Sequence, residues 1–405
     1  MLNKNQNNED LNYYRWLYEP DNVSIKLDQK FRQIIFKKAL RKVKSMTDLA
    51  KSIQLSKQTL FNHRYGKSMN VKGLKVLLHF IGIDLLQAEE QVIGISENKI
   101  KLPIKLNTQE SAILFAAILG DGSNSTRVMY KNKDKTLLDK IAMNTKKCLG
   151  DVNVPYSISA KGIPYISLPR ITGRILDYVG VPYGKQTNQN PGIPVVIMNS
   201  KTSVKKEFIK QFFDDEGWVE PDQMRVALSQ CNTCRLPEEF GESIKNKGVV
   251  YINEIPAAIK DKIQPPHLLV DLQDILKNEF NIHSNLRFKR LLIRKKHITA
   301  AFELEIQRKQ EVRKFYEKIN FSSPTKKKRL EFLINRDRNF PSNISLLIIN
   351  EAIKLAKEKG FFVAHELARS LGFPQPPIRK RLTTLVKKGI FDKKKEKFLV
   401  NIKLD

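Results

Sequence analysis

The chain has 405 residues and carries 72 lysines and arginines against 42 aspartates and glutamates, which gives a formal net charge of +30. Its hydrophobic fraction of 41% excludes a wholly disordered chain, no apolar run is long enough to span a bilayer, and three cysteines exclude a disulfide framework. The excess of positive charge favours a polyanionic partner, and nucleic acid is the first candidate.

The N-terminal part of the chain predicts an arm followed by a small helical domain. Residues 1–20 are polar with scattered aromatic side chains, and we expect them to form a loosely ordered arm. Apolar residues at helical spacing then predict four helices, at residues 31–43, 48–53, 57–65 and 71–81. Thr47 is the expected N-cap of the second helix, Gly82 ends the fourth, and residues 94–101 are expected to be a linker.

Residues 47–82 resemble a repressor-type helix-turn-helix domain. Apolar residues occupy the positions expected for its core, namely Leu49, Ala50, Ile53, Leu55 and Leu60. The second helix of the motif would present donor-rich side chains that suit base edges and phosphates in the major groove: Lys57, Gln58, Thr59, Asn62, His63 and Arg64. The alternative is a plain three-helix packing unit.

The middle of the chain contains a weak internal repeat. A predicted helix at residues 108–119 ends in Gly120-Asp121-Gly122, and a second helix at residues 203–213 ends in Asp215-Glu216-Gly217. Each copy continues with strand-like sequence, an amphipathic helix, and a further strand and helix. The amphipathic helices are predicted at residues 137–149 and 268–280. The repeat therefore predicts a tandem pair of α-β-β-α units, with residues 232–266 as an insertion in the second.

The two copies resemble the nonapeptide of the LAGLIDADG homing endonucleases. The residues that carry the resemblance are 114–122, LFAAILGDG, and 209–217, IKQFFDDEG. The resemblance covers roughly residues 104–335 and implies an α+β fold, in which tandem pseudo-symmetric α-β-β-α-β-β-α halves form a DNA-binding saddle. We expect an N-terminal arm and helix-turn-helix domain, an endonuclease-like domain with two halves, and a C-terminal domain, at residues 1–98, 99–340 (halves about 104–205 and 206–335) and 341–405.

Helices that pack closely along their lengths need small residues at i and i+4. The first copy has Ala116 and Gly120 at these positions, whereas the second has Gln211 and Asp215. The second copy therefore departs from the pattern, and we expect either that the two helices do not pack closely or that they cross more widely.

The resemblance implies that Asp121 and Glu216 meet on the pseudo-two-fold axis and hold Mg²⁺ or Mn²⁺. Hard divalent ions favour carboxylates together with phosphate oxygens, and they promote phosphodiester hydrolysis by activating water. The family also implies a polar residue followed by lysine near the attacking water. Asn132 and Lys133 fit these roles in the first half. Gln230 fits in the second half, but Cys231 stands where lysine is usual, so we expect unequal half-sites and a slow or one-strand cut.

The C-terminal residues predict three helices, at 344–359, 363–371 and 377–388, and a hairpin at 390–403. Three helices and a two-stranded wing are typical of a winged helix, which places its third helix in the major groove and its wing on the DNA backbone. The candidate DNA-binding residues are Arg379, Lys380, Arg381, Thr384, Lys393 and Lys394. Some winged helices bind protein instead.

The leading functional hypothesis is a site-specific double-stranded DNA endonuclease that acts as a monomer, because both halves lie in one chain. The main alternative is a transcription regulator that keeps the fold as a DNA-reading platform, and an RNA partner is the less favoured third hypothesis. The polar first ten residues lack the apolar segment of a signal peptide, so we expect a cytoplasmic, nucleoid-associated protein without a membrane partner. The motif Cys231-Asn232-Thr233-Cys234 has no second pair for zinc and is expected to be structural.

Overall fold

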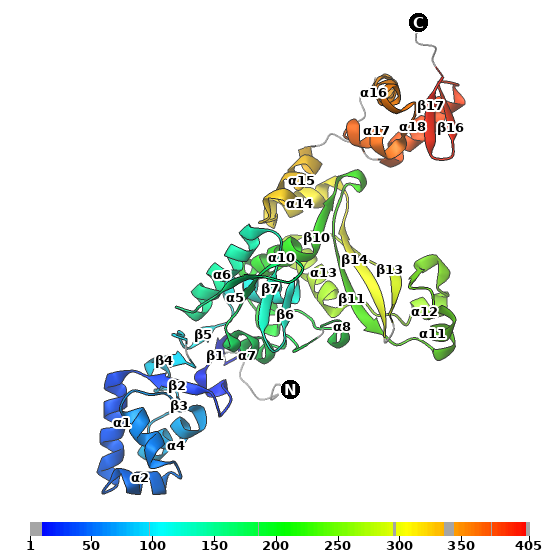
Figure 1. Ribbon diagram of the computed structural model, residues 1–405. Helices are drawn as coiled ribbons and strands as arrows, with labels where there is room; N and C mark the ends of the chain where they lie inside the picture. Colours follow the sequence, from blue (N-terminus) through cyan, green and yellow to red (C-terminus); the bar gives the residue numbers. More distant parts are fainter. Residues whose placement is uncertain are drawn as a thin grey trace. The chain divides into compact units, whose positions relative to one another are not determined.

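The computed structural model describes residues 10–96, 98–184, 186–294, 297–335, 344–373 and 375–401, and it has a mixed α+β fold (Figure 1). The backbone divides into two compact units, one formed by Met1–Asp215 with Pro266–Leu268 and the other by Glu216–Pro265 with Leu269–Asp405. The predicted boundary between residues 340 and 341 lies outside the described residues. None of the described helices is long and apolar enough to cross a membrane.

The described part of the N-terminal arm is packed, and the expectation of a loosely ordered arm is wrong there. Strand β1 (Tyr13–Tyr14) pairs with β5 (Ile104–Lys105). The side chains of Tyr14 and Trp16 are only 1% and 0% exposed. Large aromatic side chains gain much from leaving water, and this gain fixes the arm against the rest of the first unit.

The four predicted N-terminal helices are confirmed as α1 (Gln29–Lys42), α2 (Met46–Ser52), α3 (Lys57–Arg64) and α4 (Val71–Ile81). The N-cap of α2 is Ser45 rather than Thr47, because the Ser45 hydroxyl accepts the Asp48 N–H at 3.1 Å. A small sheet accompanies the helices, with β2 (Ser24–Leu27) between β3 (Met69–Asn70) and β4 (Val92–Ile95). The expected linker at residues 94–101 therefore begins inside a strand.

The first copy of the repeat has the order α-β-β-α-β-β-α. Its elements are α5 (Gln109–Leu119), β6 (Gly122–Asn124), β7 (Val128–Lys131), α6 (Lys135–Leu149), β8 (Tyr156–Ile158), β9 (Pro164–Ser167) and α7 (Arg170–Tyr178). The four strands form an antiparallel sheet in the order β6-β7-β9-β8. Thr108 caps α5 by accepting the Ser111 N–H at 3.2 Å, as its place before the apolar run predicts.

The second copy repeats this order with longer strands. They are α10 (Thr202–Glu216), β10 (Gly217–Glu220), β11 (Arg225–Cys234), α13 (His267–Phe280), β13 (Asn285–Arg294), β14 (His297–Ile306) and α14 (Lys309–Lys318). Its sheet order, β10-β11-β14-β13, matches that of the first copy strand for strand. The predicted α-β-β-α units therefore each contain a second β-β-α half.

The insertion in the second copy adds a strand to its sheet. Between β11 and α13 lie α11 (Glu238–Ile244), β12 (Val249–Tyr251) and α12 (Ala257–Lys260), and β12 pairs with β13 at the edge of the sheet. The insertion was expected from residue 232, but β11 continues to Cys234. The short helices α8 (Gln186–Gln189) and α9 (Val195–Met198) connect the copies, and α15 (Pro324–Asn335) follows the second.

The C-terminal segment forms the predicted three helices and hairpin with one additional strand. Helices α16 (Ile344–Lys359), α17 (Ala364–Ser370) and α18 (Gln375–Lys387) precede β16 (Phe391–Lys394) and β17 (Lys397–Val400). The additional strand β15 (Phe362–Val363) pairs with β17. Phe362, Phe391 and Phe398 pack against one another at the centre of this small core.

The C-terminal ends of α5 and α10 approach closely at one position. A Cβ atom added to Gly120 would lie 2.8 Å from Asp215 Cβ and 2.9 Å from Asp215 Oδ2. Real Cβ atoms do not approach other atoms this closely, so only glycine fits at residue 120. The predicted small residue is therefore required on one side of the contact, and an aspartate fills the other.

We expect Gly120→Ala to lower the free energy of unfolding by about 1–3 kcal/mol, because the added methyl group must displace Asp215 or the end of α10. Urea titration of the full chain measures this loss. Gly241→Ala is the matched control, since it makes the same change in α11, where a Cβ atom meets nothing within 4 Å. Equal stability of the two variants would contradict the close approach.

Candidate active site and nucleic-acid surfaces

Each repeat places an acidic residue directly before the first strand of a hairpin, at the same position in the pairing register. Asp121 precedes β6, in which Gly122 pairs with Tyr130. Glu216 precedes β10, in which Gly217 pairs with Leu228. Counting along the second strand of each hairpin, Asn132 and Gln230 are equivalent, and so are Lys133 and Cys231. These are the pairs of positions that the sequence predicts.

A hydrogen-bond network connects the acid of the first hairpin to α10. The Asn132 side-chain amide donates to Asp121 Oδ2 at 2.9 Å and to the Tyr130 hydroxyl at 3.2 Å. Tyr130 donates in turn to Asp215 Oδ1 at 2.5 Å. Gln211 Nε2 donates to both carboxylate oxygens of Asp215, each at 3.1 Å. We name the five residues of this network, Asp121, Asn132, Tyr130, Asp215 and Gln211, the interhelix network.

The protein environment raises the pKa of two members of this network. Burial raises the pKa of Asp215 well above its ordinary value, and the charge of Asp121 raises it further, while the hydrogen bonds from Tyr130 and Gln211 act in the opposite direction. Burial, followed by the charge of Asp215, raises the pKa of Tyr130. Tyr130 therefore keeps its proton and remains a donor to Asp215.

A second contact fixes α10 to the first repeat. Lys140 Nζ on α6 lies 3.8 Å from Asp214 Oδ2, and the Asp214 side chain is 0% exposed. Burial lowers the pKa of Lys140, and the charge of Asp214 opposes this shift. Asp214 and Asp215 thus both point into the first unit, although sequence reasoning singled out only Asp215, as a departure from small residues.

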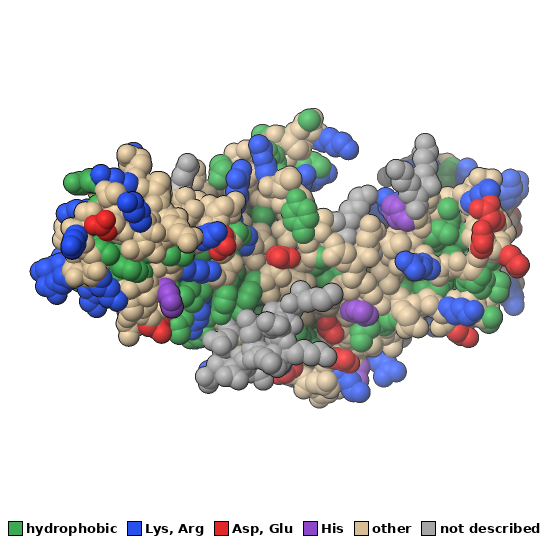
Figure 2. Space-filling model, turned by 90° about the horizontal axis from the view of Figure 1, so that it is seen from below, with side chains coloured by type: hydrophobic (Ala, Val, Ile, Leu, Met, Phe, Trp, Pro, Cys, Tyr) green, Lys and Arg blue, Asp and Glu red, His purple; other side chains and the backbone are tan. Residues whose placement is uncertain are grey.

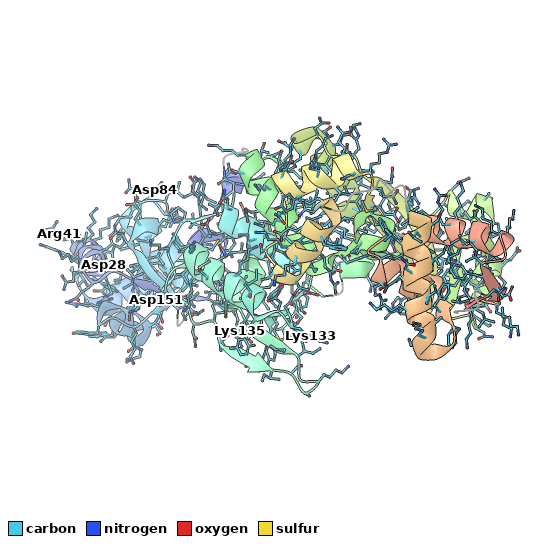
Figure 3. The ribbon with its side chains drawn as sticks, turned by 90° about the horizontal axis from the view of Figure 1, so that it is seen from above. Asp28, Arg41, Asp84, Lys133, Lys135 and Asp151 are labelled. Carbon is cyan, nitrogen blue, oxygen red and sulfur yellow. The ribbon has the colours of Figure 1, made fainter. Side chains whose placement is uncertain are left out.

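Sequence reasoning missed Tyr130, which connects the two sides of the interhelix network. Its side chain is 0% exposed. The available signal was its position two residues before Asn132, which places both side chains on the same side of the strand. By contrast, the exposed Lys133 and Lys135 flank Asp134, the N-cap of α6, and their side chains are drawn in Figure 3.

Cys231, in the second repeat, faces arginines from another strand. In the sheet register Cys231 pairs with Ala301, and Ala301 pairs with Arg290 on β13. The small side chain of Ala301 leaves room between them. Burial raises the pKa of the Cys231 thiol, while the charges of Arg290 and then Arg294 lower it and that of Glu216 raises it. The thiol carries no positive charge. The exposed Arg290, two strands away in the same cross-strand register, supplies a guanidinium group on this part of the sheet.

Acidic side chains on this face of the second sheet are paired with cations. Arg225 forms ion pairs with Glu220 at 2.7 Å, with Glu303 at 3.4 Å and with Glu305. Lys289 adds pairs to Glu303 at 3.1 Å and to Glu305 at 3.5 Å. Because these carboxylates are neutralised by neighbours, the face that also carries Arg290 is compatible with a polyanion.

Helix α3 presents most of its predicted DNA-binding residues to solvent. Lys57, Gln58 and Arg64 are exposed, and Thr59 and Asn62 are half-buried. Figure 2 shows Lys and Arg side chains gathered on the surface of the N-terminal domain.

His63 differs from the other residues predicted on α3, because it is 0% exposed and belongs to the core. Its Nδ1 lies 2.9 Å from the Lys67 carbonyl oxygen, and its ring packs against Phe36. A side chain enclosed in this way cannot reach a base, so the prediction that His63 contacts DNA is wrong.

The C-terminal candidates all lie on the surface. The exposed residues of α18 are Arg379, Lys380, Arg381 and Thr384, and those of the hairpin are Lys393 and Lys394. Ile378, Leu382 and Leu385 of the same helix are buried. The helix therefore separates an apolar core face from a cationic outer face, as its sequence predicts.

Cys231 and Cys234 lie on one strand, three residues apart, so their side chains leave opposite faces of the sheet. This arrangement does not suit a shared zinc ion. Among the described residues, no group of three or more His, Cys, Asp or Glu side chains could hold a metal ion. Asp121 and Glu216 remain as carboxylate donors of the kind that Mg²⁺ prefers when phosphate completes its shell.

No protein-family profile matches the chain, and no curated protein is similar to it in sequence. Among solved structures, mesophilic variants of the homing endonuclease I-DmoI are 14% identical, with a TM-score of 0.32 over 55% of this chain and 97% of that chain. Full-length DUF199/WhiA from Thermatoga maritima is 13% identical, with a TM-score of 0.30 over 70% and 93%. The homing endonuclease I-WcaI bound to its DNA recognition sequence is 13% identical, with a TM-score of 0.31 over 55% and 87%. The likeness is partial, so a functional assignment depends on the residues of this chain.

We expect the stability of the N-terminal domain to fall on acidification because of His63. Burial lowers the pKa of His63 from 6.5 to about 4, the Lys67 carbonyl opposes the shift, and Arg32 adds to it. Between these values the unfolded chain binds a proton that the folded chain does not. The stabilisation is therefore complete above pH 6.5 and decreases toward pH 4, by about 2 kcal/mol at pH 5.

Amide hydrogen exchange of α3 and α4 at pH 7 and pH 5, corrected for intrinsic exchange rates, measures this loss. His63→Gln removes the titrating group and should flatten the pH dependence, although the variant is less stable at pH 7. An unchanged slope in His63→Gln would show that another group is responsible.

Proposed function

We propose that this protein is a site-specific double-stranded DNA endonuclease of the LAGLIDADG type. The observation that carries the proposal is the equivalent register of the two hairpins. It gives Asp121 and Glu216 the same position in two units of identical strand order. Two copies of an acid that ends a helix and begins a hairpin are the arrangement that a two-fold phosphodiester-cleaving centre requires.

Asp121 and Glu216 would hold a divalent cation, Mg²⁺ or Mn²⁺, together with phosphate oxygens of DNA. When bound, such a cation activates water and stabilises the attacking and leaving oxygens of phosphodiester hydrolysis. Within the chain, Asn132 would orient the Asp121 carboxylate by donating to Oδ2. Lys133, which follows Asn132, and Gln230, at the position equivalent to Asn132, would contact the phosphate or the attacking water.

Cationic side chains outside the repeats would extend the contact with DNA. The proposed contacts on α3 are Lys57, Gln58, Thr59, Asn62 and Arg64, and those of the C-terminal domain are Arg379, Lys380, Arg381, Thr384, Lys393 and Lys394. Exposed donors on a helix suit base edges and phosphates, and the net charge of +30 supports a polyanionic partner. Because both repeats lie in one chain, a monomer would suffice.

A DNA-binding regulator without cleavage is the second candidate. Cys231 favours it, because burial raises the pKa of a thiol that stands at the position equivalent to Lys133. A thiol offers no cation to a scissile phosphate, so this half-site would lose activity unless another residue replaces the lysine.

The decisive experiment is a cleavage selection with the purified full chain on host genomic DNA and a random-site library. We expect discrete ends in Mg²⁺ and none in Ca²⁺. Asp121→Asn and Glu216→Gln should each lower cleavage by at least about a hundredfold while DNA binding persists. Asp139→Asn is the matched control, because it removes an exposed carboxylate on α6. Sequence-specific binding without ends above the variant background would establish the regulator.

Arg290 is proposed as the cation of the second half-site in place of the missing lysine. We expect Arg290→Ala to slow cutting of one strand by at least about tenfold, so that nicked plasmid accumulates before linear product. Cys231→Lys in the same variant should restore linearisation, because it returns a cation to the position equivalent to Lys133. Arg313→Ala, an exposed arginine of α14, serves as the control. Equal rates for both strands in Arg290→Ala would exclude this role.

A further inference from the structure

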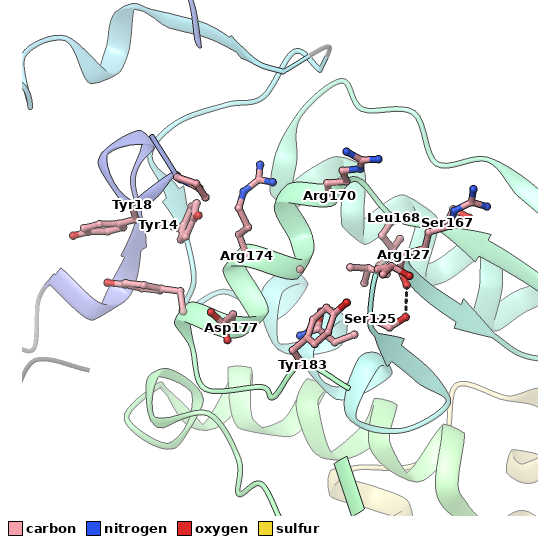
Figure 4. Close-up of a pocket in the computed structure, with 16 residues that line it drawn as sticks. Tyr14, Tyr18, Ser125, Arg127, Ser167, Leu168, Arg170, Arg174, Asp177 and Tyr183 are labelled. Atoms are coloured by element: carbon pink, nitrogen blue, oxygen red, sulfur yellow. Dashed lines mark hydrogen bonds between the residues drawn. The ribbon is translucent and has the colours of Figure 1, made fainter. Parts of the chain in front are cut away.

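A cavity in the first unit lies apart from the interhelix network. Its volume is about 700 Å³, and it is lined by the N-terminal arm, the β6–β7 hairpin, the end of β9, helix α7 and the segment after α7 (Figure 4). None of Asp121, Asn132 and Tyr130 lines it. The volume is within the range of sites that hold a small organic ligand.

Tyrosine side chains form much of the wall. On one side Tyr18 stacks on Tyr178, with ring centroids 4.9 Å apart, and Tyr14 packs edge-on against Tyr178 at 5.5 Å. Tyr183, on the other side, is 55% exposed, and no other described aromatic ring pairs with it. Its free ring face is suited to stacking with a planar ring, because stacking is tolerant of the partner's identity.

Arginines give the cavity an excess of positive charge. Arg174 is already neutralised by Glu19, whose Oε2 lies 2.6 Å from Arg174 Nε. Arg127 and Arg170 are exposed, and neither forms an ion pair with any described residue. Asp177 also lines the cavity, which leaves one unbalanced cation. Guanidinium groups in this setting suit a phosphate group.

One buried acceptor in the lining lacks a partner. Asn124 is 1% exposed, and its Nδ2 donates to the carbonyl oxygens of Val181 at 3.2 Å and Pro182 at 3.4 Å. Its Oδ1 has no hydrogen-bond partner. Gly173 lies beside this oxygen, and a Cβ atom added there would lie 3.3 Å from Asn124 Oδ1 and 3.0 Å from Val128 Cγ2. A buried acceptor without a partner is costly, and an N–H group of a ligand would satisfy it.

We infer that this cavity binds a nucleotide, with the base on Tyr183, an N–H of the base donating to Asn124 Oδ1, and the phosphate at Arg127 and Arg170. The inference does not depend on the proposed cleavage activity, since it uses none of the same residues. The shared chemistry, a base with an attached phosphate, has two sources, namely a free nucleotide or an unpaired nucleotide of a nucleic acid.

The test measures binding to the full chain by calorimetry in two arms. The first arm uses the four nucleoside 5′-monophosphates and the matching nucleosides. The second compares a DNA duplex that carries one extrahelical nucleotide with the same duplex fully paired. Selective binding of a monophosphate assigns the free nucleotide as ligand, and preference for the extrahelical duplex alone assigns the nucleic acid.

Variants separate the contributions of the lining. We expect Arg127→Ala and Arg170→Ala each to weaken binding of the monophosphate by at least about tenfold without changing that of the nucleoside. Tyr183→Ala should weaken both ligands. Gly173→Ala should also weaken both, because the added methyl group would press on Asn124 Oδ1 and Val128 Cγ2. Arg313→Ala should change neither.

Two outcomes would overturn the inference. One is the absence of binding to every nucleotide and of any preference for the extrahelical duplex. The other is binding that Arg127→Ala, Arg170→Ala and Tyr183→Ala leave unchanged, because the ligand would then occupy another site. Thermal unfolding of each variant distinguishes a loss of binding from a loss of folding. Tyr183→Ala should keep the unfolding temperature of the unmodified chain, because Tyr183 is 55% exposed.

Discussion

The contact between Gly120 and Asp215 is the constraint on which the first unit depends. A backbone without a side chain at residue 120 lets a carboxylate lie against it, and Tyr130 and Gln211 then satisfy the carboxylate oxygens. A buried carboxylate without these donors would be strongly unfavourable. The Gly120–Asp215 contact therefore depends on Tyr130 and Gln211, because they supply the hydrogen bonds that the buried Asp215 carboxylate needs.

In this network a hydrogen-bonded carboxylate, Asp215, occupies the helix contact where a small residue is usual. Small residues allow helices to approach through van der Waals contact alone, and they tolerate rotation of one helix on the other. The hydrogen bond from Tyr130 on β7 to Asp215 on α10 is directional, so it restrains α10 against the hairpin that follows α5, while Gln211 supports Asp215 from within α10. The polar arrangement is thus more specific than it is stabilising, since its hydrogen bonds largely offset the desolvation of the carboxylate.

Local signals in the sequence were sufficient for the helices and for the equivalence of the repeats. Thr108 before an apolar run predicts the start of α5, and two acid-glycine pairs at matching places predict two equivalent copies. What the sequence could not reveal depends on contacts between distant residues. Arg290 reaches the row of Cys231 through a strand register with an irregularity after Phe288, which no local pattern encodes. His63 was assigned to the DNA-binding face because its neighbours on α3 are hydrogen-bond donors. Only its contact with Phe36 shows that the side chain is buried.

The two proposed half-sites differ in the source of the cation that would contact the phosphate. In the first, Lys133 follows Asn132 along the chain, so the cation and the residue that holds Asp121 move together. In the second, the strand supplies Gln230 and a neutral thiol, and the nearest cation comes from β13 across Ala301. A guanidinium spreads its charge over a planar fork, whereas an ammonium concentrates it at one point. The two halves would therefore stabilise the same developing charge with different geometry. Under the proposed cleavage, the sheet register would therefore set an order in which the two strands are cut.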